Sequence, residues 1–292
     1  MYKKTVIFGG SGFLGSYVAD ELTKRNYKVL IADKTQSEYV KQYPFVEVDI
    51  LDSESVEKAI SDADYVYNFV AIANLDEAID KPIMTMQINV MGNMNILEAC
   101  RKNGKIERFI YASSAYALSE DGSFYGISKR TSEKVIEEYY KRYSLKYTII
   151  RYGSVYGERG SHNNYIYNLI ETALQTGKLE FKGDGEDIRE YIHGADTAKL
   201  SVDILEDLQF ENEHLILTGI EKMKRIELLT MINEIMGNRL EIINVDKDYF
   251  GHYKITPYAF HPTVAKKLVA NPFIDLGQGL LEVIRTISEE KN

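Results

Sequence analysis

The stretch TVIFGGSGFLG (residues 5–15) contains a short apolar run that leads directly into closely spaced glycines. Residues 5–8 are typical of a buried strand, residues 14–26 of an amphipathic helix, and residues 28–33 of a second strand. Glycines between such a strand and helix let the backbone turn tightly and bring the first helical amides close to an anionic group. The stretch therefore predicts the first βαβ unit of an α/β fold, with a phosphate-binding loop at its turn.

The alternation of strand and helix patterns continues through the first half of the chain. The expected strands are apolar on both faces, which is typical of a parallel sheet covered by helices on both sides. We therefore predict an α/β protein built on a Rossmann-type doubly wound parallel sheet. Further strands are expected at 45–48, 65–70, 108–112 and 147–152, and helices at 53–60, 82–102 and 125–143.

Beyond about residue 153 the pattern becomes less regular and predicts a small C-terminal α/β substrate lobe. We expect residues 1–160 to form the dinucleotide-binding domain, a segment near 188–218 to return to it, and residues 161–292 to form most of the lobe. Helices are expected at 164–176, 195–206, 226–236 and 276–287, and strands at 179–181, 214–217 and 240–243.

Composition excludes several classes of protein. The 292 residues are 45% hydrophobic and 27% charged, with a net charge of −9, which argues against a general binder of nucleic acid or anionic membranes. The single cysteine, Cys100, suits a small buried side chain in a reducing compartment. No apolar run approaches the length of a signal peptide or membrane span, so a cytoplasmic protein is expected, without a metal site.

Two acidic residues follow the second and third strands and bear on the choice of cofactor. Asp33 lies about twenty residues after the glycine loop, where a carboxylate accepts hydrogen bonds from the ribose hydroxyls of NAD and repels the extra phosphate of NADP. The neighbouring Lys34 leaves NADP possible. Asp49 either accepts from the adenine amino group or caps the following helix.

A second motif, FYGISKR (residues 124–130), places Tyr125 four residues before Lys129. With 22 tyrosines in the chain, roughly two such pairs are expected by chance. The pair gains weight from Ser114, which ends a predicted strand at the sheet edge where ligands bind. Residues at i and i+4 share a helix face, so the phenol and the ammonium can point into one cleft.

These three side chains suit the oxidation of an alcohol. A phenol has a pKa of about 10, and a nearby ammonium together with a positive nicotinamide ring favours the phenolate. The phenolate of Tyr125 would take the proton of a substrate hydroxyl while hydride leaves the carbon. Ser114 would hold the same oxygen by a hydrogen bond, and Lys129 would sustain the phenolate.

The combination resembles the extended short-chain dehydrogenase/reductase family, and within it the nucleotide-sugar epimerases and dehydratases. The resemblance covers roughly residues 4–200 and rests on FGGSGFLG, QINVMGNMNILEA, FIYASSA, YGISKRTSE, RYGSVYG and REYIHGADTA. It implies that Arg189 meets a substrate diphosphate, that Asn164 contacts the substrate or caps a helix, and that Asn89 supports the catalytic region. The cofactor contacts it implies are Gly9, Gly12, Phe13, Leu14, Gly15, Asp33, Asp49, Ile50, Val70, Ala71, Asn89, Tyr125, Lys129 and Tyr152.

Departures from the family patterns reduce the number of reactions that the sequence allows. Ala115 and Tyr116 stand where sugar 4,6-dehydratases carry an Asp–Glu pair, which argues against elimination. Ser154 replaces an Asn that many epimerases place near the diphosphate. The second arginine that epimerases often supply from the C-terminal lobe is not identifiable, and Lys254 is the nearest cationic candidate.

The resemblance implies an NAD-dependent sugar-nucleotide epimerase that oxidises a ring hydroxyl to a ketone and returns the hydride to the other face. An NAD(P)-dependent keto-sugar reductase or dehydrogenase would use the same residues, and a dinucleotide-sensing regulator without chemistry is a third hypothesis. The family also implies a homodimer formed by the helix after Pro82 and the Tyr125 helix, with Tyr139, Tyr140 and Tyr143 near the interface.

Overall fold

The centre of the molecule is an eight-stranded sheet in the order β13-β10-β6-β5-β4-β1-β2-β3, in which all neighbouring strands are parallel. The computed structural model describes residues 2–161, 163–246, 252–257 and 266–290. The predicted doubly wound sheet is confirmed. Its strands are β1 (Lys4–Phe8), β2 (Lys28–Asp33), β3 (Phe45–Glu47), β4 (Tyr65–Asn68), β5 (Arg108–Ser114), β6 (Tyr147–Tyr152), β10 (Glu213–Leu217) and β13 (Lys266–Leu268).

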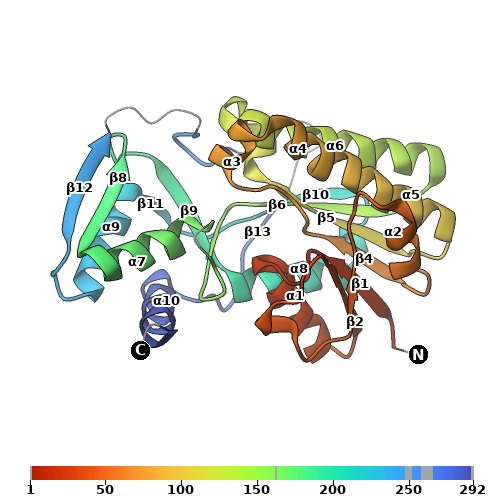
Figure 1. The fold of residues 1–292 in the computed structure, drawn as a ribbon, viewed down its shortest axis with the longest axis horizontal. Coiled ribbons are helices and arrows are strands. Elements are labelled where there is room, and N and C mark those ends of the chain that lie inside the picture. The colour runs from red at the N-terminus through yellow and green to blue at the C-terminus, as the bar shows by residue number, and fades with distance from the viewer. Residues whose placement is uncertain (1, 162, 247–251, 258–265, 291–292) are drawn as a thin grey trace.

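Helices cover both faces of this sheet (Figure 1). On one face α1 (Phe13–Lys24) packs against α8 (Gly194–Glu206), and their apolar side chains meet those of β1, β2 and β6 in one core. On the other face α2 (Ser53–Ala59), α5 (Asn93–Asn103) and α6 (Ser123–Tyr143) bury a second core. Cys100 is buried there, and burial raises the pKa of its thiol, so the prediction of a small buried side chain is confirmed.

The single helix predicted over 82–102 is divided into three segments in the structure. It consists of α4 (Pro82–Met86), one wider π turn at η2 (Gln87–Gly92), and α5. A Cβ at Gly92 would come within 2.3 Å of the Ile50 side chain. The backbone of this turn therefore packs directly against Ile50. Wider turns of this kind occur mostly at functional sites, and this one contains Asn89.

The smaller lobe has a core of its own, shown on the left in Figure 1. Its strands form a three-stranded sheet in the order β11-β9-β7 and a two-stranded sheet of β12 and β8. Its helices are α7, α9 and α10, and α10 packs against the other two. The elements are β7 (Ser154–Tyr156), α7 (Tyr165–Thr176), β8 (Lys178–Lys182), β9 (Ile188–His193), β11 (Lys222–Lys224), α9 (Arg225–Ile235), β12 (Glu241–Asp246) and α10 (Leu276–Glu290).

The carboxyl ends of the central strands point toward this lobe, so the two units face each other across the sheet edge (Figure 1). A short helix, α3 (Leu75–Asp80), follows β4 at this edge. The sequence did not predict α3, β7, β9, β11 or β13, because such short segments are defined by their pairing and not by a long periodic pattern. In the part of the chain that the structure describes, no helix is both long and apolar enough to cross a membrane.

Candidate active site

The glycine loop links β1 to α1 in a conformation that is possible because glycine has no side chain. Gly9 has φ +74°, and its carbonyl accepts a hydrogen bond from the Gly12 amide at 3.1 Å. A Cβ at Gly15 would lie 2.3 Å from the Gly9 carbonyl oxygen. The helix begins without a side-chain cap, so the first amides of α1, from Phe13 onward, have no side-chain acceptor and can serve as donors for an anionic group.

Asp33 lies at the end of β2, where it accepts a hydrogen bond from the loop amide of Ser11 at 3.0 Å. Burial raises the pKa of its carboxyl. The neighbouring Lys34 forms an ion pair with Asp49 at 3.0 Å. The cation that left NADP possible is therefore paired with a carboxylate, and both partners are largely exposed.

Asp49 does not cap the helix that follows β3, so that alternative is wrong. Its carboxylate accepts from the Leu51 amide at 2.9 Å, and this hydrogen bond lowers the pKa of Asp49. The cap of α2 is Asp52, which accepts from Glu54 at 3.1 Å. The proposed contact between Asp49 and adenine stays a prediction.

Asn89 connects the wide helical turn to the loop after β4. Its side chain accepts from the Ile72 amide at 2.8 Å and donates to the Ile72 carbonyl at 3.0 Å. It also donates to the Ser128 hydroxyl at 2.9 Å, on the same helix as Tyr125. This buried amide therefore fixes the β4–α3 loop and the catalytic helix relative to each other.

Tyr125, Lys129 and Ser114 are brought together as predicted. Tyr125 is 9% exposed, and its phenol interacts by a hydrogen bond with Ser114, which is 7% exposed. The Ser114 hydroxyl also accepts from the Tyr116 amide at 3.2 Å, which fixes its orientation at the end of β5. Lys129 is 2% exposed and donates to the Ala112 carbonyl at 2.6 Å.

The protonation of these groups differs from the expectation. Burial raises the pKa of Tyr125 to about 12, and the hydrogen bond with Ser114 offsets only part of this effect. The Lys129 ammonium bonds to a strand carbonyl and lies 5.8 Å from the centre of the Tyr125 ring. Burial lowers the pKa of Lys129 to about 7. In the protein alone desolvation therefore outweighs the attraction between the ammonium and the phenolate.

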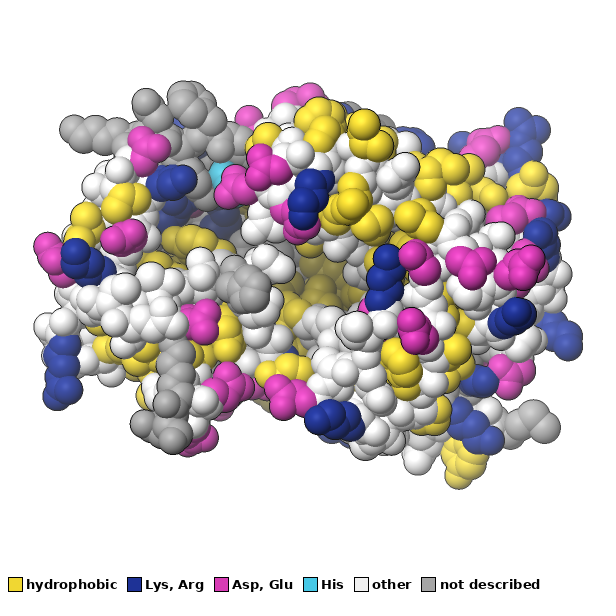
Figure 2. Space-filling view, in the orientation of Figure 1, with side chains coloured by type: hydrophobic (Ala, Val, Ile, Leu, Met, Phe, Trp, Pro, Cys, Tyr) yellow, Lys and Arg dark blue, Asp and Glu magenta, His cyan; other side chains and the backbone are white. Residues whose placement is uncertain are grey.

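The main cavity lies between the sheet edge and the smaller lobe and has a volume of about 690 Å³. Figure 2 shows a hollow at this place, with hydrophobic side chains at its floor. Ser114 and Tyr116 line it on the sheet side, and Asn164, Arg189 and residues of α7 line it on the lobe side. A volume of this size is within the usual range for small-molecule sites.

Two arginines share one carboxylate in the wall of this cavity. Arg189 forms an ion pair with Asp187 at 3.3 Å, and Arg225 pairs with the same carboxylate at 2.8 Å. All three side chains are at most 10% exposed. Arg225 also donates to the Lys182 carbonyl at 2.7 Å. The cluster has a formal charge of +1 and suits an anionic part of a ligand.

Sequence reasoning missed Arg225, because it begins a predicted helix, where a basic residue is usually solvated. Lys254, the candidate named from the sequence, is exposed and does not line the cavity. Glutamate or aspartate is the residue type favoured at a helix start, so an arginine at this position is the signal that the sequence offered.

A hydrogen bond between Tyr116 and His252 crosses the cavity. The Tyr116 hydroxyl lies 2.8 Å from Nδ1 of His252, and the Tyr116 ring contacts that of Tyr125 edge-on. Burial, with Arg189 and Arg225 nearby, lowers the pKa of His252 to about 4. The imidazole is therefore neutral at neutral pH, and its Nδ1 shares a hydrogen bond with the Tyr116 hydroxyl.

Of the remaining predicted site residues, one lines the cavity and the others lie in the cores or in the loop after β4. Asn164 lines the cavity and also caps α7, accepting from Tyr167 at 3.2 Å. The Tyr152 hydroxyl bonds to Ser201 at 2.9 Å in the core beneath α8, so only its backbone can face a ligand. Ile50 is buried against α5, and Val70 and Ala71 lie in the half-buried loop after β4.

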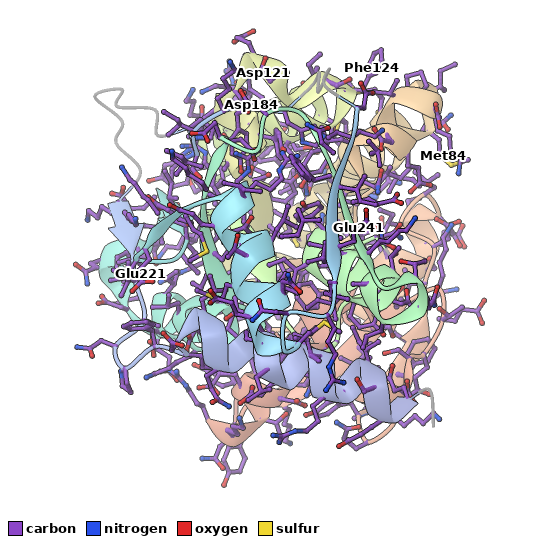
Figure 3. All side chains as sticks on the ribbon, turned by 90° about the vertical axis from the view of Figure 1, so that its left-hand side faces the viewer. Met84, Asp121, Phe124, Asp184, Glu221 and Glu241 are labelled. Atoms are coloured by element: carbon purple, nitrogen blue, oxygen red, sulfur yellow. The ribbon has the colours of Figure 1, made fainter. Side chains whose placement is uncertain are left out.

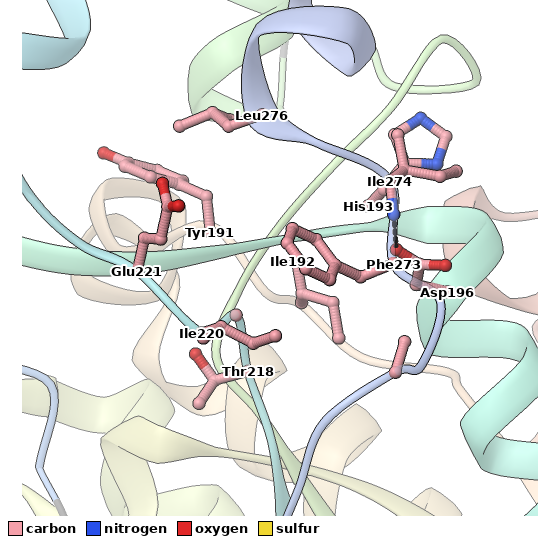
Figure 4. Close-up of a pocket in the computed structure, with 12 residues that line it drawn as sticks. Tyr191, Ile192, His193, Asp196, Thr218, Ile220, Glu221, Phe273, Ile274 and Leu276 are labelled. Atoms are coloured by element: carbon pink, nitrogen blue, oxygen red, sulfur yellow. Dashed lines mark hydrogen bonds between the residues drawn. The ribbon is translucent and has the colours of Figure 1, made fainter.

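A second pocket, of about 30 Å³, lies beside β9 and has room for about one water molecule (Figure 4). Its wall is fixed by a hydrogen bond of 2.7 Å from the Ile274 amide to Asp196. His193, Asp196 and Glu221 are the titratable side chains of types His, Asp and Glu that line it. Among the described residues, no group of three or more His, Cys, Asp or Glu side chains is arranged to hold a metal ion.

Comparison with known proteins agrees with this geometry. The model of the NAD dependent epimerase/dehydratase family matches residues 5–217, which include the glycine loop, Ser114, Tyr125 and Arg189. The chain belongs to this family. It is thereby an enzyme of the extended short-chain dehydrogenase/reductase type, in an NAD-dependent family, as the sequence motifs indicated.

Several members of this family are similar over nearly the whole chain. A putative UDP-glucose 4-epimerase of Methanocaldococcus jannaschii is 30% identical over 96% of both chains. A UDP-N-acetyl-alpha-D-glucosaminuronate decarboxylase of Bacillus cytotoxicus is 28% identical over 100% of both. The crystal structure of UDP-glucuronic acid 4-epimerase from Bacillus cereus, in complex with UDP-glucuronic acid and NAD, shares the fold, with a TM-score of 0.86, 24% identity and coverage of 98% and 99%.

The residues present fit NAD. The glycines at Gly9–Gly15 let the loop fold tightly against the start of α1, whose first amides carry no side-chain cap and suit a pyrophosphate. Asp33 supplies a carboxylate for a ribose, and the pairing of Lys34 with Asp49 leaves no free cation at that position for a further phosphate. Lys129 and Tyr125 lie at the end of β5, beside Ala112 and Ser114.

The buried charge of Lys129 should reduce stability in a pH-dependent way. Its pKa is about 7 in the folded protein and 10.5 in the unfolded chain, so the cost of burying the ammonium is fully present below pH 7. That cost falls as pH rises between these two values. We expect Lys129→Met to raise the free energy of unfolding by about 1–3 kcal/mol at neutral pH, and by less as the pH approaches 10.

Urea denaturation followed by circular dichroism at several pH values measures this difference. Lys134→Met, at an exposed position of the same helix, is the control and should show no such trend. A Lys129→Met protein that is less stable than the natural one at every pH would contradict the prediction.

Proposed function

We propose that the protein is an NAD-dependent sugar-nucleotide epimerase. The observation that carries the proposal is the buried Tyr125–Ser114–Lys129 arrangement, which opens onto a cavity with two arginines. Two of the relatives named above are described as a UDP-glucose and a UDP-glucuronic acid 4-epimerase. Their substrates are UDP-sugars, which combine an alcohol to oxidise with a diphosphate to anchor.

The reaction begins with a sugar hydroxyl beside Tyr125. A bound NAD would supply the hydride acceptor for the sugar carbon in the first half of the reaction and the hydride donor in the second. Tyr125 takes the hydroxyl proton and gives it back in the second half of the reaction, which is general base and general acid catalysis by one group. Ser114 donates a hydrogen bond to the same oxygen as it becomes a carbonyl.

Lys129 remains beside the phenol throughout. The Lys129 ammonium, with the positive ring that a bound NAD would add, would lower the pKa of Tyr125 from the high value that burial gives it. The keto-sugar must then rotate in the cavity, so that its opposite face receives the returning hydride. The large cavity, anchored at one end by Arg189 and Arg225, supplies room for this rotation.

The test is an assay with UDP-glucose, UDP-N-acetylglucosamine and UDP-glucuronic acid, with products separated by chromatography. We expect the 4-epimer to form without net change in absorbance at 340 nm, because the hydride returns to the substrate. Tyr125→Phe should lower kcat about 10²–10⁴-fold, since it removes the acid–base group. Tyr140→Phe, on the same helix, is the matched control and should retain activity.

Consumption of added NADH or NADPH would instead indicate the keto-sugar reductase. Release of carbon dioxide from UDP-glucuronic acid would indicate a decarboxylase, the activity in the name of the Bacillus cytotoxicus relative. No conversion of any of these substrates by the natural protein would contradict the epimerase proposal.

Within this function, Arg225 is the second anchor of the substrate diphosphate. Its guanidinium and that of Arg189 bind the same carboxylate, so their donors converge in one part of the cavity. Each provides charged hydrogen bonds to phosphate oxygens, and the loss of one should cost about 10–100-fold in affinity.

Binding of UDP by calorimetry tests this role. Arg225→Met and Arg189→Met should each weaken binding by that factor, and Lys254→Met, at an exposed position outside the cavity, should leave it unchanged. Unfolding curves recorded alongside verify that the variants fold. If Arg225→Met bound UDP as tightly as the natural protein, the second anchor would lie elsewhere.

We also infer a homodimer formed by α4, η2 and α6. These segments expose large apolar side chains on one face: Ile83 is 75%, Ile127 54% and Met91 51% exposed. Yellow side chains gather there in Figure 2, and Figure 3 shows Met84 and Phe124 pointing away from the molecule. Apolar patches of this kind mark interaction sites.

Light scattering should therefore give twice the chain mass of 33.4 kDa. Ile127→Glu places a charge within the apolar face and should shift the protein to the monomer. Leu208→Glu, at an exposed apolar residue outside these three segments, should not. A monomer at all concentrations for the natural protein would contradict the assembly.

A further inference from the structure

The ammonium of Lys129 lies between two aromatic rings. Its Nζ is 4.8 Å from the centre of the Tyr111 ring and 5.8 Å from that of Tyr125, and it donates to the Ala112 carbonyl at 2.6 Å. A cation within about 6 Å of an aromatic face is attracted by the ring electrons, most strongly where water is excluded. Tyr111 is the nearer of the two rings and has no part in the proposed proton transfer.

Tyr111 is held firmly in this position. It lies in the middle of β5, between β4 and β6, and is 1% exposed. Its ring stacks on that of Phe109, with centres 6.4 Å apart and planes 23° apart. Because the strand and the neighbouring ring both constrain Tyr111, it presents a fixed face to Lys129.

Few other groups offset the cost of burying the Lys129 ammonium. Glu133 is the carboxylate that raises the pKa of Lys129, against the larger effect of burial. Glu133 is itself bonded to Arg151 at 2.7 Å and to Ser113 at 2.5 Å. Among the residues that the structure describes, no carboxylate forms an ion pair with Lys129. A buried charge without such a partner depends on hydrogen bonds and on polarisable groups around it.

We propose that Tyr111 is a positioning residue of the active site, whose ring holds the Lys129 ammonium in place and keeps it charged beside Tyr125. The interaction belongs to the ring and not to its hydroxyl. Tyr111→Phe should therefore preserve it, whereas Tyr111→Leu should remove it. The placement of Lys129 stands independently of the reaction, while its consequence for turnover rests on the proposed epimerase function.

The direct test is a nuclear magnetic resonance titration of protein labelled with carbon-13 at lysine Cε. The Lys129 signal is assigned by its absence in Lys129→Met. We expect the titration midpoint to fall by about one pH unit in Tyr111→Leu, which is the size of a desolvated cation–ring interaction, and to stay unchanged in Tyr111→Phe. An unchanged midpoint in Tyr111→Leu, or equal shifts in both variants, would overturn the proposal.

Tyr111→Leu leaves a smaller side chain in a packed core and can fail to fold. A series with one, two and three fluorine atoms on phenylalanine at position 111 keeps the shape and progressively weakens the electron density of the ring face. The midpoint should then fall stepwise along the series. A midpoint that does not change along the series would mean that Tyr111 only fills space.

The two proposals fail in different ways. The titration needs no substrate, so a stepwise shift without any epimerisation would leave the role of Tyr111 intact and reject the proposed function. With turnover established, the alkaline decline of kcat should move to lower pH in Tyr111→Leu and stay in place in Tyr111→Phe. A purely structural role would lower kcat equally at every pH.

Discussion

The burial of one lysine ammonium against the end of a central strand is the constraint on which the site depends. Lys129 reaches from α6 to the Ala112 carbonyl, and this contact fixes the height and rotation of the helix relative to β5. Tyr125, one turn earlier, is thereby brought to the hydroxyl of Ser114. The arrangement costs stability, because the charge loses its water, and the surrounding rings and carbonyl offset only part of that cost.

The rest of the fold supports this contact from two directions. Asn89, in the wide turn of the neighbouring helix, bonds both to the loop after β4 and to Ser128 on α6. The glycine loop lets α1 begin close to β1, so that helix amides and strand ends share one edge of the sheet. The smaller lobe faces that edge and contributes the arginines. The residues proposed for the reaction thus lie on β5 and α6 beside the sheet edge, and those proposed to anchor the substrate lie on the lobe.

Much of this could be predicted from the sequence, because the signals were local. The glycine loop, the buried strands and the spacing of Tyr125 and Lys129 each depend on a few consecutive residues. The lobe was harder: β9 and β11 are short strands that pair only in the folded chain, and Arg225 enters the cavity from a helix start that looks solvated in the sequence. The pKa of Tyr125 was also beyond the sequence, since the balance between burial and attraction depends on where the ammonium points.

Asp187 has a consequence for how an anion would enter the cavity. Its carboxylate touches both Arg189 and Arg225, and so it serves as a counter-ion that is built into the chain. Two guanidinium groups that would otherwise repel each other are held together by this carboxylate without help from dissolved salt. A diphosphate bound as proposed above would therefore meet cationic groups that are already held in place.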